Sequence, residues 1–173
     1  MRTVETAALT LEPQAARHAV EMFAVLSDPA IYEYENEPPA SMEALSRRYT
    51  ALESRRSPDG REQWLNWVIR LPTGEAIGYV QATVYPDRRA AIAYELGSAW
   101  WGRGLARQAV EAMVAELAAQ HGARRLTAVL KQRNVRSLRL LERIGFAPAA
   151  ADDPLRQGID AGEWLMQREV HDG

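Results

Sequence analysis

The sequence predicts a three-layer α/β fold built around one mixed, mostly antiparallel sheet. Strand-like and helical segments follow one another in the order β-α-α-β-β-β-α-β-α-β. A strand over 90–96, a long helix over 105–121 and a strand over 125–130 form a crossover unit, which pairs its strands in parallel. A Pro-Thr-Gly turn separates strands over 63–70 and 75–85, which predicts a hairpin. We expect about six to seven strands and about four flanking helices.

The amino-terminal third is expected to contain one strand and two helices. Residues 5–11 are predicted to form the first strand, and residues 13–26 the first helix. An Asp-Pro pair ends that helix, and residues 32–39 are irregular, acidic and aromatic. A serine at position 41 can cap a second helix that runs to about residue 56. The predicted inner face of the first helix comprises Ala16, Ala19, Val20 and Phe23.

The remaining chain alternates strands and helices. The helix over 105–121 has a continuous apolar stripe and a glycine placed to end it. A short helix over 135–144, closed by Gly145, follows the strand over 125–130. Residues 149–161 are predicted to be a loop, and residues 163–170 a final strand. The stripe of the long helix comprises Leu105, Ala109, Val110, Met113, Val114 and Leu117.

Composition limits the class of protein. A chain of 173 residues is long enough for one domain with a sizeable core, so we expect a single domain over 1–173. The 21 basic and 23 acidic residues nearly cancel, which argues against a nucleic-acid-binding role. The start lacks an apolar signal core and no apolar run is long enough to span a bilayer, so we expect a cytoplasmic protein without membrane contact.

Two reactive residue types offer little. The chain has no cysteine, which excludes disulfides, thiolate metal sites and a cysteine acyl-enzyme. The three histidines, His18, His121 and His171, fall on separate elements. We therefore expect no metal site and no serine–histidine pair.

The stretch Trp100-Trp101-Gly102-Arg103-Gly104-Leu105-Ala106 is the most informative segment. It joins the strand over 90–96 to the long helix. Two glycines one residue apart allow a tight turn, and the exposed N–H groups point with the positive end of the helix. Such a loop can hold a pyrophosphate, although close helix–sheet packing also requires glycine. Arg103 and Arg107 lie on one helix face and can either pair with phosphates or remain solvated.

A second motif, Asn134-Val135-Arg136-Ser137, followed by Leu141-Glu142-Arg143-Ile144-Gly145-Phe146, lies about thirty residues downstream. Together the two motifs resemble the GNAT N-acetyltransferase superfamily, and most closely the branch that includes ribosomal-protein N-terminal acetyltransferases. Two positions depart from the commonest family pattern. Trp101 stands where Gln or Arg is usual, although tryptophan is frequent at this position in the branch that the chain resembles. Leu141 stands where many members carry a tyrosine general acid.

The resemblance implies an acetyl-CoA-dependent N-acetyltransferase that uses direct attack by a primary amine. Glu95 would be the general base, directly or through water, and Ser137 would lie near the departing sulfur. A backbone N–H among residues 95–97, at the end of the strand over 90–96, can polarise the thioester carbonyl. The pantetheine arm can pair with the same strand if the parallel strand beside it splays away. Asn134 can also act simply as a helix N-cap. The implied coenzyme contacts are Leu96, Gly97, Trp101, Gly102, Arg103, Gly104, Leu105, Ala106, Arg107 and Asn134.

The resemblance implies a small-molecule amine or a peptide N-terminus as the acceptor, and peptide amino termini, amino acids, polyamines and amino sugars all remain open. Residues 32–37 carry three carboxylates and two tyrosines between the first two helices, where the family's acceptor-side loops lie. Carboxylates and aromatic faces attract cations, so we expect an acceptor with a further positive charge, or a basic peptide end. The expected contacts are Tyr32, Glu33, Tyr34 and Glu35, with an ordinary solvated loop as the alternative.

Two other functions compete with catalysis. A non-catalytic acyl-CoA-binding sensor or partner module is kept open by Leu141, whereas Glu95 and Ser137 argue against it. A dinucleotide-binding domain fits poorly, because the loop lacks the third glycine of that motif and follows a hairpin. The sequence leaves the oligomeric state open between a monomer and a homodimer.

Overall fold

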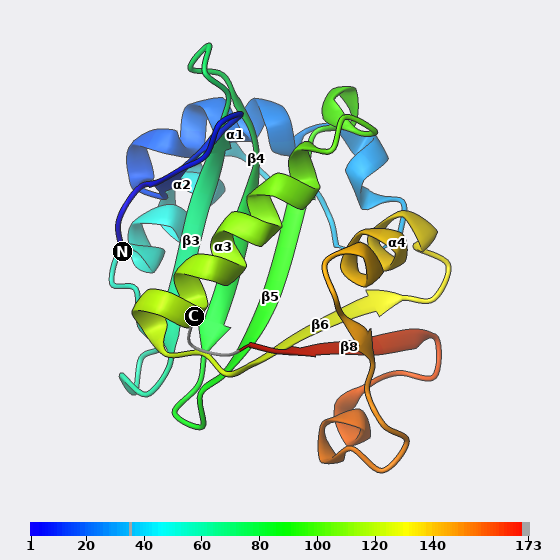
Figure 1. Ribbon diagram of the computed structural model, residues 1–173. Helices are drawn as coiled ribbons and strands as arrows, with labels where there is room; N and C mark the ends of the chain where they lie inside the picture. Colours follow the sequence, from blue (N-terminus) through cyan, green and yellow to red (C-terminus); the bar gives the residue numbers. More distant parts are fainter. Residues whose placement is uncertain (35, 171–173) are drawn as a thin grey trace.

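The computed structural model describes residues 1–34 and 36–170 (Figure 1). Its strands are β1 (Val4–Glu5), β2 (Thr10–Pro13), β3 (Gln63–Arg70), β4 (Ala76–Val84), β5 (Arg89–Leu96), β6 (Arg125–Lys131), β7 (Ala147–Pro148) and β8 (Glu163–Glu169). Its α-helices are α1 (Ala19–Leu26), α2 (Met42–Leu52), α3 (Leu105–His121) and α4 (Val135–Arg143). Short 3₁₀ turns are η1 (Ala16–His18), η2 (Pro29–Tyr32), η3 (Ser98–Trp100) and η4 (Pro154–Gly158).

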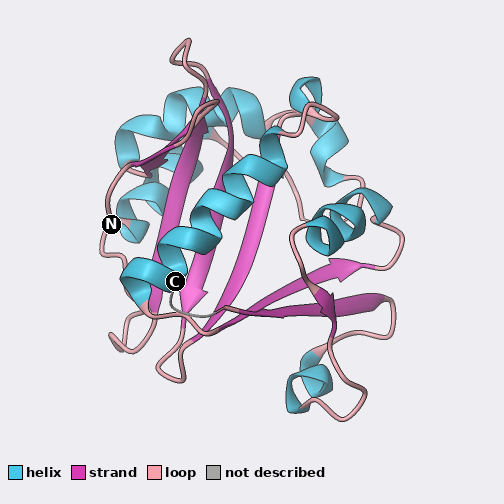
Figure 2. Cartoon of the chain, viewed as in Figure 1, coloured by secondary structure: helices cyan, strands magenta, loops and turns pink. Residues whose placement is uncertain are grey.

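The strands form one mixed sheet, in the order β1-β2-β3-β4-β5-β6-β8-β7. Within the described residues the β5–β6 pair alone is parallel, and the other neighbouring pairs are antiparallel. Helices α1 and α2 cover one face, whereas α3 and α4 lie on the other (Figures 1 and 2). The predicted three-layer α/β class is therefore confirmed.

The two faces have separate cores because strand residues alternate. Trp67 on β3 is fully buried toward α3, and its indole N–H donates to the Arg2 carbonyl oxygen at 3.1 Å. The next residue, Val68, packs on the other face with Met22 of α1 and Tyr49 of α2. The β3–β5 strands are thus held from both sides, which makes them a rigid platform for the residues at their ends.

The prediction of a single strand over 5–11 was wrong. A turn interrupts it, because the Thr6 hydroxyl oxygen accepts the N–H groups of Leu9 at 3.0 Å and Ala8 at 3.3 Å. Such local side-chain bonding competes with the sheet ladder. The segment therefore makes two strands, β1 and β2. With the two-residue β7, which pairs with β8, the described residues contain eight strands, one more than the upper expectation.

The first helix begins later than predicted, at Ala19 instead of residue 13. Pro13 belongs to β2 and pairs with Trp67, and the Ala15 N–H is taken by the His18 ring at 2.9 Å. The buried face of α1 comprises Ala19, Met22 and Leu26, so Val20 points away from it, is 67% exposed and does not belong to the predicted inner face. Helix α2 also ends earlier, at Leu52, because Arg55 adopts a left-handed φ of 59°.

Candidate active site

The cavity of interest lies where β5 and β6 separate. Their pairing runs from Arg89 and Arg125 to Ala91 and Thr127 and then stops. Beyond that point β6 diverges from β5, as Figure 1 shows. The resulting cavity has a volume of about 510 Å³ and is lined by β5, the start of α3, β6 and α4. The sheet is therefore incomplete on one side of the last residues of β5.

The backbone of β5 presents hydrogen-bonding groups to this cavity. Two bonds fix the alternation of the β4–β5 ladder: Tyr85 N–H to Arg89 O, and Gly97 N–H to Ile77 O, each at 2.9 Å. In an antiparallel pair such bonded positions occur at every second residue. The N–H and C=O groups of Tyr94 and Leu96 consequently point the other way, toward the gap left by β6.

The glycine loop at the start of α3 has the predicted geometry. Gly102 and Gly104 have φ values of 73° and 74°, a region that side chains rarely adopt. A Cβ placed on either glycine would meet no atom within 4 Å, so close packing does not explain them. Gly104 is the N-cap and supplies no side-chain bond to the first turn of this helix. The N–H groups that open α3 are thus available to an anion.

Trp101 forms the wall between this loop and β5. Its indole N–H donates to the Leu96 carbonyl oxygen at 2.9 Å. The Arg136 guanidinium carbon lies 3.4 Å from the centroid of the Trp101 ring, so the side chain reaches across the cavity from α4. The tryptophan that departs from the common family pattern therefore ties the loop to the strand.

The two loop arginines differ in position. Arg107 lines the cavity and forms an ion pair with Glu111 one turn later, at 3.0 Å. Arg103 is exposed, is not among the lining residues, and places its guanidinium 5.0 Å from the Trp100 ring centroid. Gly97 also lies outside the lining, and its N–H is used by Ile77. Of the expected backbone donors at the strand end, Leu96 faces the gap.

The start of α4 supplies a cap and a hydroxyl. The Asn134 side-chain oxygen accepts the Ser137 N–H at 3.1 Å, as the capping interpretation predicted. The Tyr94 hydroxyl donates to the Ser137 hydroxyl oxygen at 3.2 Å and lies 3.4 Å from its carbonyl oxygen. Burial raises the pKa of Tyr94 to about 12, so the phenol remains protonated near neutral pH. Leu141, one turn later, is buried and also lines the cavity.

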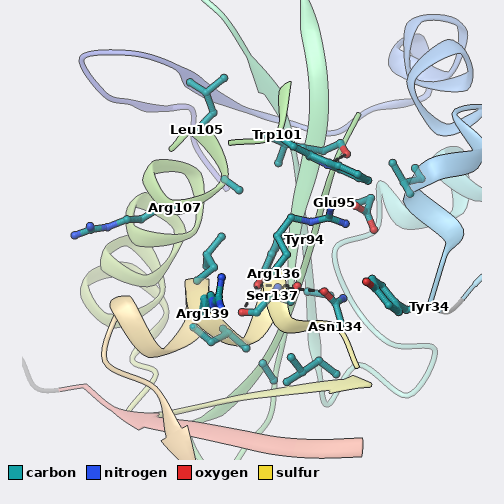
Figure 3. A pocket seen from close by; sticks show the side chains of 18 of the residues that line it. Tyr34, Tyr94, Glu95, Trp101, Leu105, Arg107, Asn134, Arg136, Ser137 and Arg139 are labelled. Carbon is teal, nitrogen blue, oxygen red and sulfur yellow. Dashed lines mark hydrogen bonds between the residues drawn. The ribbon is translucent and has the colours of Figure 1, made fainter. Parts of the chain in front are cut away.

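Glu95 and Tyr94 occupy opposite faces of β5, and both line the cavity (Figure 3). Glu95 pairs in register with Tyr79 of β4. Burial raises the pKa of Tyr32, and the negative charge of Glu95 adds to the effect, which places the carboxylate on the α1–α2 side. Gly78 of β4 lies so near that a Cβ there would be 2.1 Å from the Glu95 carbonyl oxygen. The glycine within β4 is thus required by the close approach of the end of β5, which carries Glu95.

The acidic segment between α1 and α2 contributes unequally. Tyr34 and Asn36 line the cavity, and the Tyr34 ring centroid lies 5.7 Å from the Arg133 guanidinium carbon. The Tyr32 hydroxyl instead donates to the Leu26 carbonyl oxygen at 2.7 Å, and Glu33 is exposed and not among the lining residues. Glu35 lies outside the described residues, as does His171.

Asp28 is a structural partner of the site that the sequence analysis did not identify. Its carboxylate accepts the Ser98 N–H at 2.7 Å and the Ala30 N–H at 3.0 Å. Hydrogen bonds from the side chain and backbone of Ser98 lower the pKa of Asp28. The Asp-Pro pair was the only signal, and it indicated a helix end. In the fold it fastens the acidic segment to the residues directly after β5.

Metal-ligating clusters and membrane-spanning helices are both absent from the described residues. In residues 1–34 and 36–170 no group of three or more His, Cys, Asp and Glu side chains is arranged to hold a metal ion. Over the same residues no helix has the length and apolar character needed to cross a membrane.

The fold and the order of the motifs agree with known proteins. Residues 8–147 match the model of the acetyltransferase (GNAT) domain family. The chain is 26% identical over 148 residues to the uncharacterized N-acetyltransferase p20 of Bacillus licheniformis, which covers 84% of this chain and 83% of that protein.

Solved structures share the fold over nearly the whole chain. A ribosomal-protein-S5-alanine acetyltransferase from Vibrio fischeri has a TM-score of 0.81 and 18% identity, with 98% of this chain and 97% of that chain covered. The ribosomal L7/L12 α-N-protein acetyltransferase RimL, in complex with coenzyme A, has a TM-score of 0.79 and 17% identity, with 97% of this chain and 98% of that chain covered.

These matches define the class as an acyltransferase that depends on acetyl-CoA. The chain belongs to the GNAT acetyltransferase family.

Proposed function

We propose that this protein transfers an acetyl group from acetyl-CoA to a primary amine by direct attack, with no acetyl-enzyme intermediate. The observation that supports the proposal best is the gap between β5 and β6. It places an uncapped helix start, strand backbone that β6 does not pair with, a carboxylate and a hydroxyl around one cavity. Acetyl-CoA is a substrate here, and its phosphates, amide arm and thioester each have a matching group.

The coenzyme side is assigned to backbone groups. Residues Gly102–Arg107 would hold the pyrophosphate on the first N–H groups of α3, where the helix dipole favours negative charge. The amide arm of the pantetheine would pair with the backbone of Tyr94 and Leu96, in place of the strand that β6 no longer provides. Asn134 and Arg107 border the same space.

The acceptor side is assigned to Glu95. An α-amine has a pKa near 7.7–8.0 and is partly free at neutral pH, so a weak base suffices to remove its proton. The nitrogen bonds to the carbonyl carbon and the C–S bond breaks, with the electron pair left on sulfur. The amine proton passes to Glu95, directly or through water. The Ser137 hydroxyl donates a hydrogen bond to the sulfur, which takes up a proton from solvent to give the free thiol.

The acceptor class follows from charge. Glu95 and the exposed carboxylates of Glu33 and Glu37 favour an amine with a second positive charge, or a basic peptide N-terminus. Tyr34 is the aromatic residue of this segment that reaches the cavity, although Arg133 already lies near one side of its ring. The family neighbours that act on ribosomal proteins make a peptide N-terminus a fitting first acceptor.

The test is thiol release from acetyl-CoA with a panel of amines, followed by mass spectrometry of the product. The panel should contain basic and acidic peptide N-termini, diamines, amino sugars and amino acids, with acetyl-CoA alone as the blank. We expect amine-dependent release and a product heavier by one acetyl group. Tight acetyl-CoA binding with no release across the panel would favour a sensor or partner module, the alternative that Leu141 suggests.

A further inference from the structure

We propose that Tyr94 is a positioning residue for the leaving group, acting through the hydroxyl of Ser137. This inference rests on the proposed acetyl transfer. The chain has Leu141 at the position on α4 where the resemblance implies a tyrosine acid. It nevertheless brings a phenol to the same part of the cavity, from β5 instead of α4 (Figure 3).

The geometry gives the phenol a specific task. Tyr94 donates to Ser137 Oγ at 3.2 Å, and a serine hydroxyl has one hydrogen of its own to donate. When its oxygen accepts from Tyr94, that hydrogen is directed away from the phenol, into the cavity that both residues line. Without this bond the hydroxyl is free to rotate among several partners. The phenol therefore orients the serine hydrogen toward the position of the departing sulfur.

The phenol is suited to remain a donor. Tyr94 is partly buried against the α3 and α4 side of the sheet, and its raised pKa keeps it protonated in the working range. Hydrogen bonds in such an environment strengthen one another. As the C–S bond breaks, negative charge on the sulfur strengthens the hydrogen bond that Ser137 donates to it. The serine oxygen becomes more negative as a result, and the hydrogen bond from Tyr94 stabilises it. No proton is gained or lost by the pair.

A purely structural role is the competing explanation. The Tyr94 hydroxyl also lies 3.4 Å from the Ser137 carbonyl oxygen, so it can simply anchor the first turn of α4. The two roles differ in what they require. Orientation of the hydroxyl needs Ser137 Oγ, whereas anchoring through the carbonyl does not.

The experiment is a double-mutant cycle with Tyr94→Phe and Ser137→Ala, measured as kcat and KM with the best acceptor. We expect Tyr94→Phe to lower kcat about tenfold, the rate equivalent of one hydrogen bond, with the KM for acetyl-CoA nearly unchanged. In the Ser137→Ala background the same change should have almost no further effect. Tyr85→Phe, in the turn between β4 and β5 and away from the cavity, is the matched control and should behave as the parent protein.

A second readout is leaving-group dependence. The Tyr94→Phe deficit should shrink with an acetyl thioester of a thiophenol, because its thiolate is a better leaving group and needs less stabilisation. Equal effects of Tyr94→Phe in the parent and Ser137→Ala backgrounds, or an equal deficit with both thioesters, would overturn the inference. Absence of transfer by the parent protein would instead count against the proposed function.

Discussion

Two joins in the same sheet use their strands in opposite ways. At the β2–β3 join, pairing is continuous from Thr10 to Pro13 and is reinforced by charged side chains. At the β5–β6 join, pairing stops after Ala91, and backbone groups beyond it face a cavity. One sheet can thus keep its strands paired near one edge, which favours stability, and leave two strands unpaired in its middle, where a ligand can enter.

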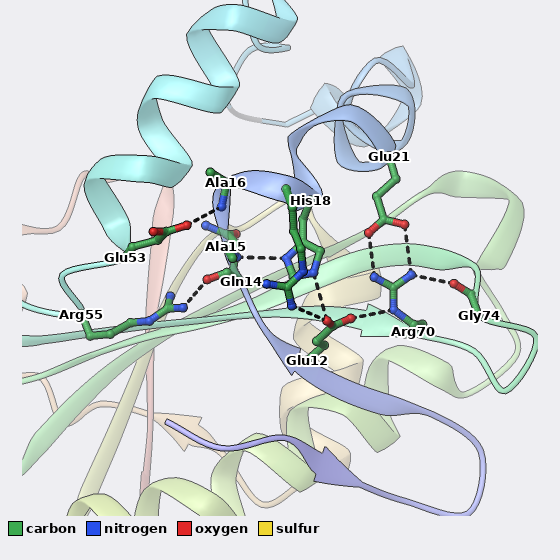
Figure 4. A network of polar contacts seen from close by, with 11 residues as sticks. Glu12, Gln14, Ala15, Ala16, His18, Glu21, Glu53, Arg55, Arg70 and Gly74 are labelled. Carbon is green, nitrogen blue, oxygen red and sulfur yellow. Dashed lines mark hydrogen bonds and ion pairs between the residues drawn. The ribbon is translucent and has the colours of Figure 1, made fainter.

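The closed join is reinforced by a charged clamp, consisting of Glu12, Arg17, His18, Glu21 and Arg70. Glu12, His18, Glu21 and Arg70 are labelled in Figure 4. Glu12 accepts hydrogen bonds from Arg17 at 2.7 Å and Arg70 at 2.8 Å, and lies 3.1 Å from the His18 ring. Arg70 also pairs with Glu21 at 2.6 Å. Every charge in the clamp has an internal partner, so it links β2, η1, α1 and β3 and offers little to a ligand.

Substitutions at the two joins should therefore change different properties of the protein. Changes at the open join should alter kinetics or coenzyme affinity and, apart from the backbone strain of a side chain at a glycine of positive φ, leave unfolding nearly unaltered. Changes in the clamp should do the reverse.

The largest effect is expected at Glu95. Glu95→Gln keeps the shape of the side chain and removes its basicity, so kcat should fall by roughly 10²–10⁴-fold while acetyl-CoA affinity is retained. Steady-state kinetics across pH, with calorimetric titration of the coenzyme, check this. Glu75→Gln, in the exposed turn before β4, is the control. Near-normal turnover of Glu95→Gln would transfer the base role to water or another group.

The next effect is expected at the glycine loop. Gly104→Val puts a branched side chain at a φ of 74°, over the N–H groups proposed to hold phosphate. We expect the Kd for acetyl-CoA to rise by about tenfold or more, measured by calorimetry, while the fold is retained.

Gly60→Val provides a matched control for Gly104→Val. Gly60 has a φ of 73°, and a Cβ added to it would likewise meet no atom within 4 Å, but it lies in a loop remote from the cavity. This variant should lose similar stability and keep its coenzyme affinity. Equal affinity in the two variants would remove the loop at Gly104 as the phosphate site.

The clamp should dominate the acid stability of the protein. Partial burial opposes ionisation of Glu12, but hydrogen bonds from Arg17, Arg70 and His18 outweigh it and lower its pKa to about 2. The folded state therefore binds this proton less readily than the unfolded chain. The stabilisation is fully present above pH 4.5 and is lost as the pH falls toward about 2.

Glu12→Gln tests this assignment. It should lower the free energy of unfolding by about 1.5–3 kcal/mol at neutral pH, the range for a hydrogen bond to a charged group. Urea unfolding from pH 7 to pH 3 should show a smaller loss of stability with acid than in the parent protein. The kinetic constants should remain close to those of the parent. A parallel pH dependence in the two proteins would contradict the role given to Glu12.

The smallest effect is expected at the acidic segment. Replacing Glu33, Glu35 and Glu37 together by Gln should raise the KM of a cationic acceptor several-fold, since exposed charges act weakly. Added salt should mimic the change in the parent protein, and the acetyl-CoA KM should hardly move. The control replaces the exposed Glu75, Glu142 and Asp152 by their amides, which removes the same charge elsewhere. An unchanged KM at low salt would exclude this segment as the recognition surface.

Local sequence signals were sufficient for most elements. The helix over 105–121 and the strand over 63–70 have the predicted bounds, because each has a long, regular apolar pattern. The first strand and first helix were misplaced because a threonine hydroxyl and a histidine ring bond to nearby backbone. Such bonds depend on rotamers that periodicity does not encode.

The sequence by itself determined the family, because the two motifs and their order can be read without a structure. It also determined the glycine loop and the capped start of α4, since each depends on residues close together in the chain. Tertiary structure decided which groups meet. The Tyr94–Ser137 contact joins residues 43 positions apart, and the Asp28–Ser98 bond joins residues 70 apart. It also decided where β6 leaves β5. Strand β6 pairs with β8 along its whole length but with β5 over three residues only, and these partners are distant in the chain, so no local pattern contains the divergence.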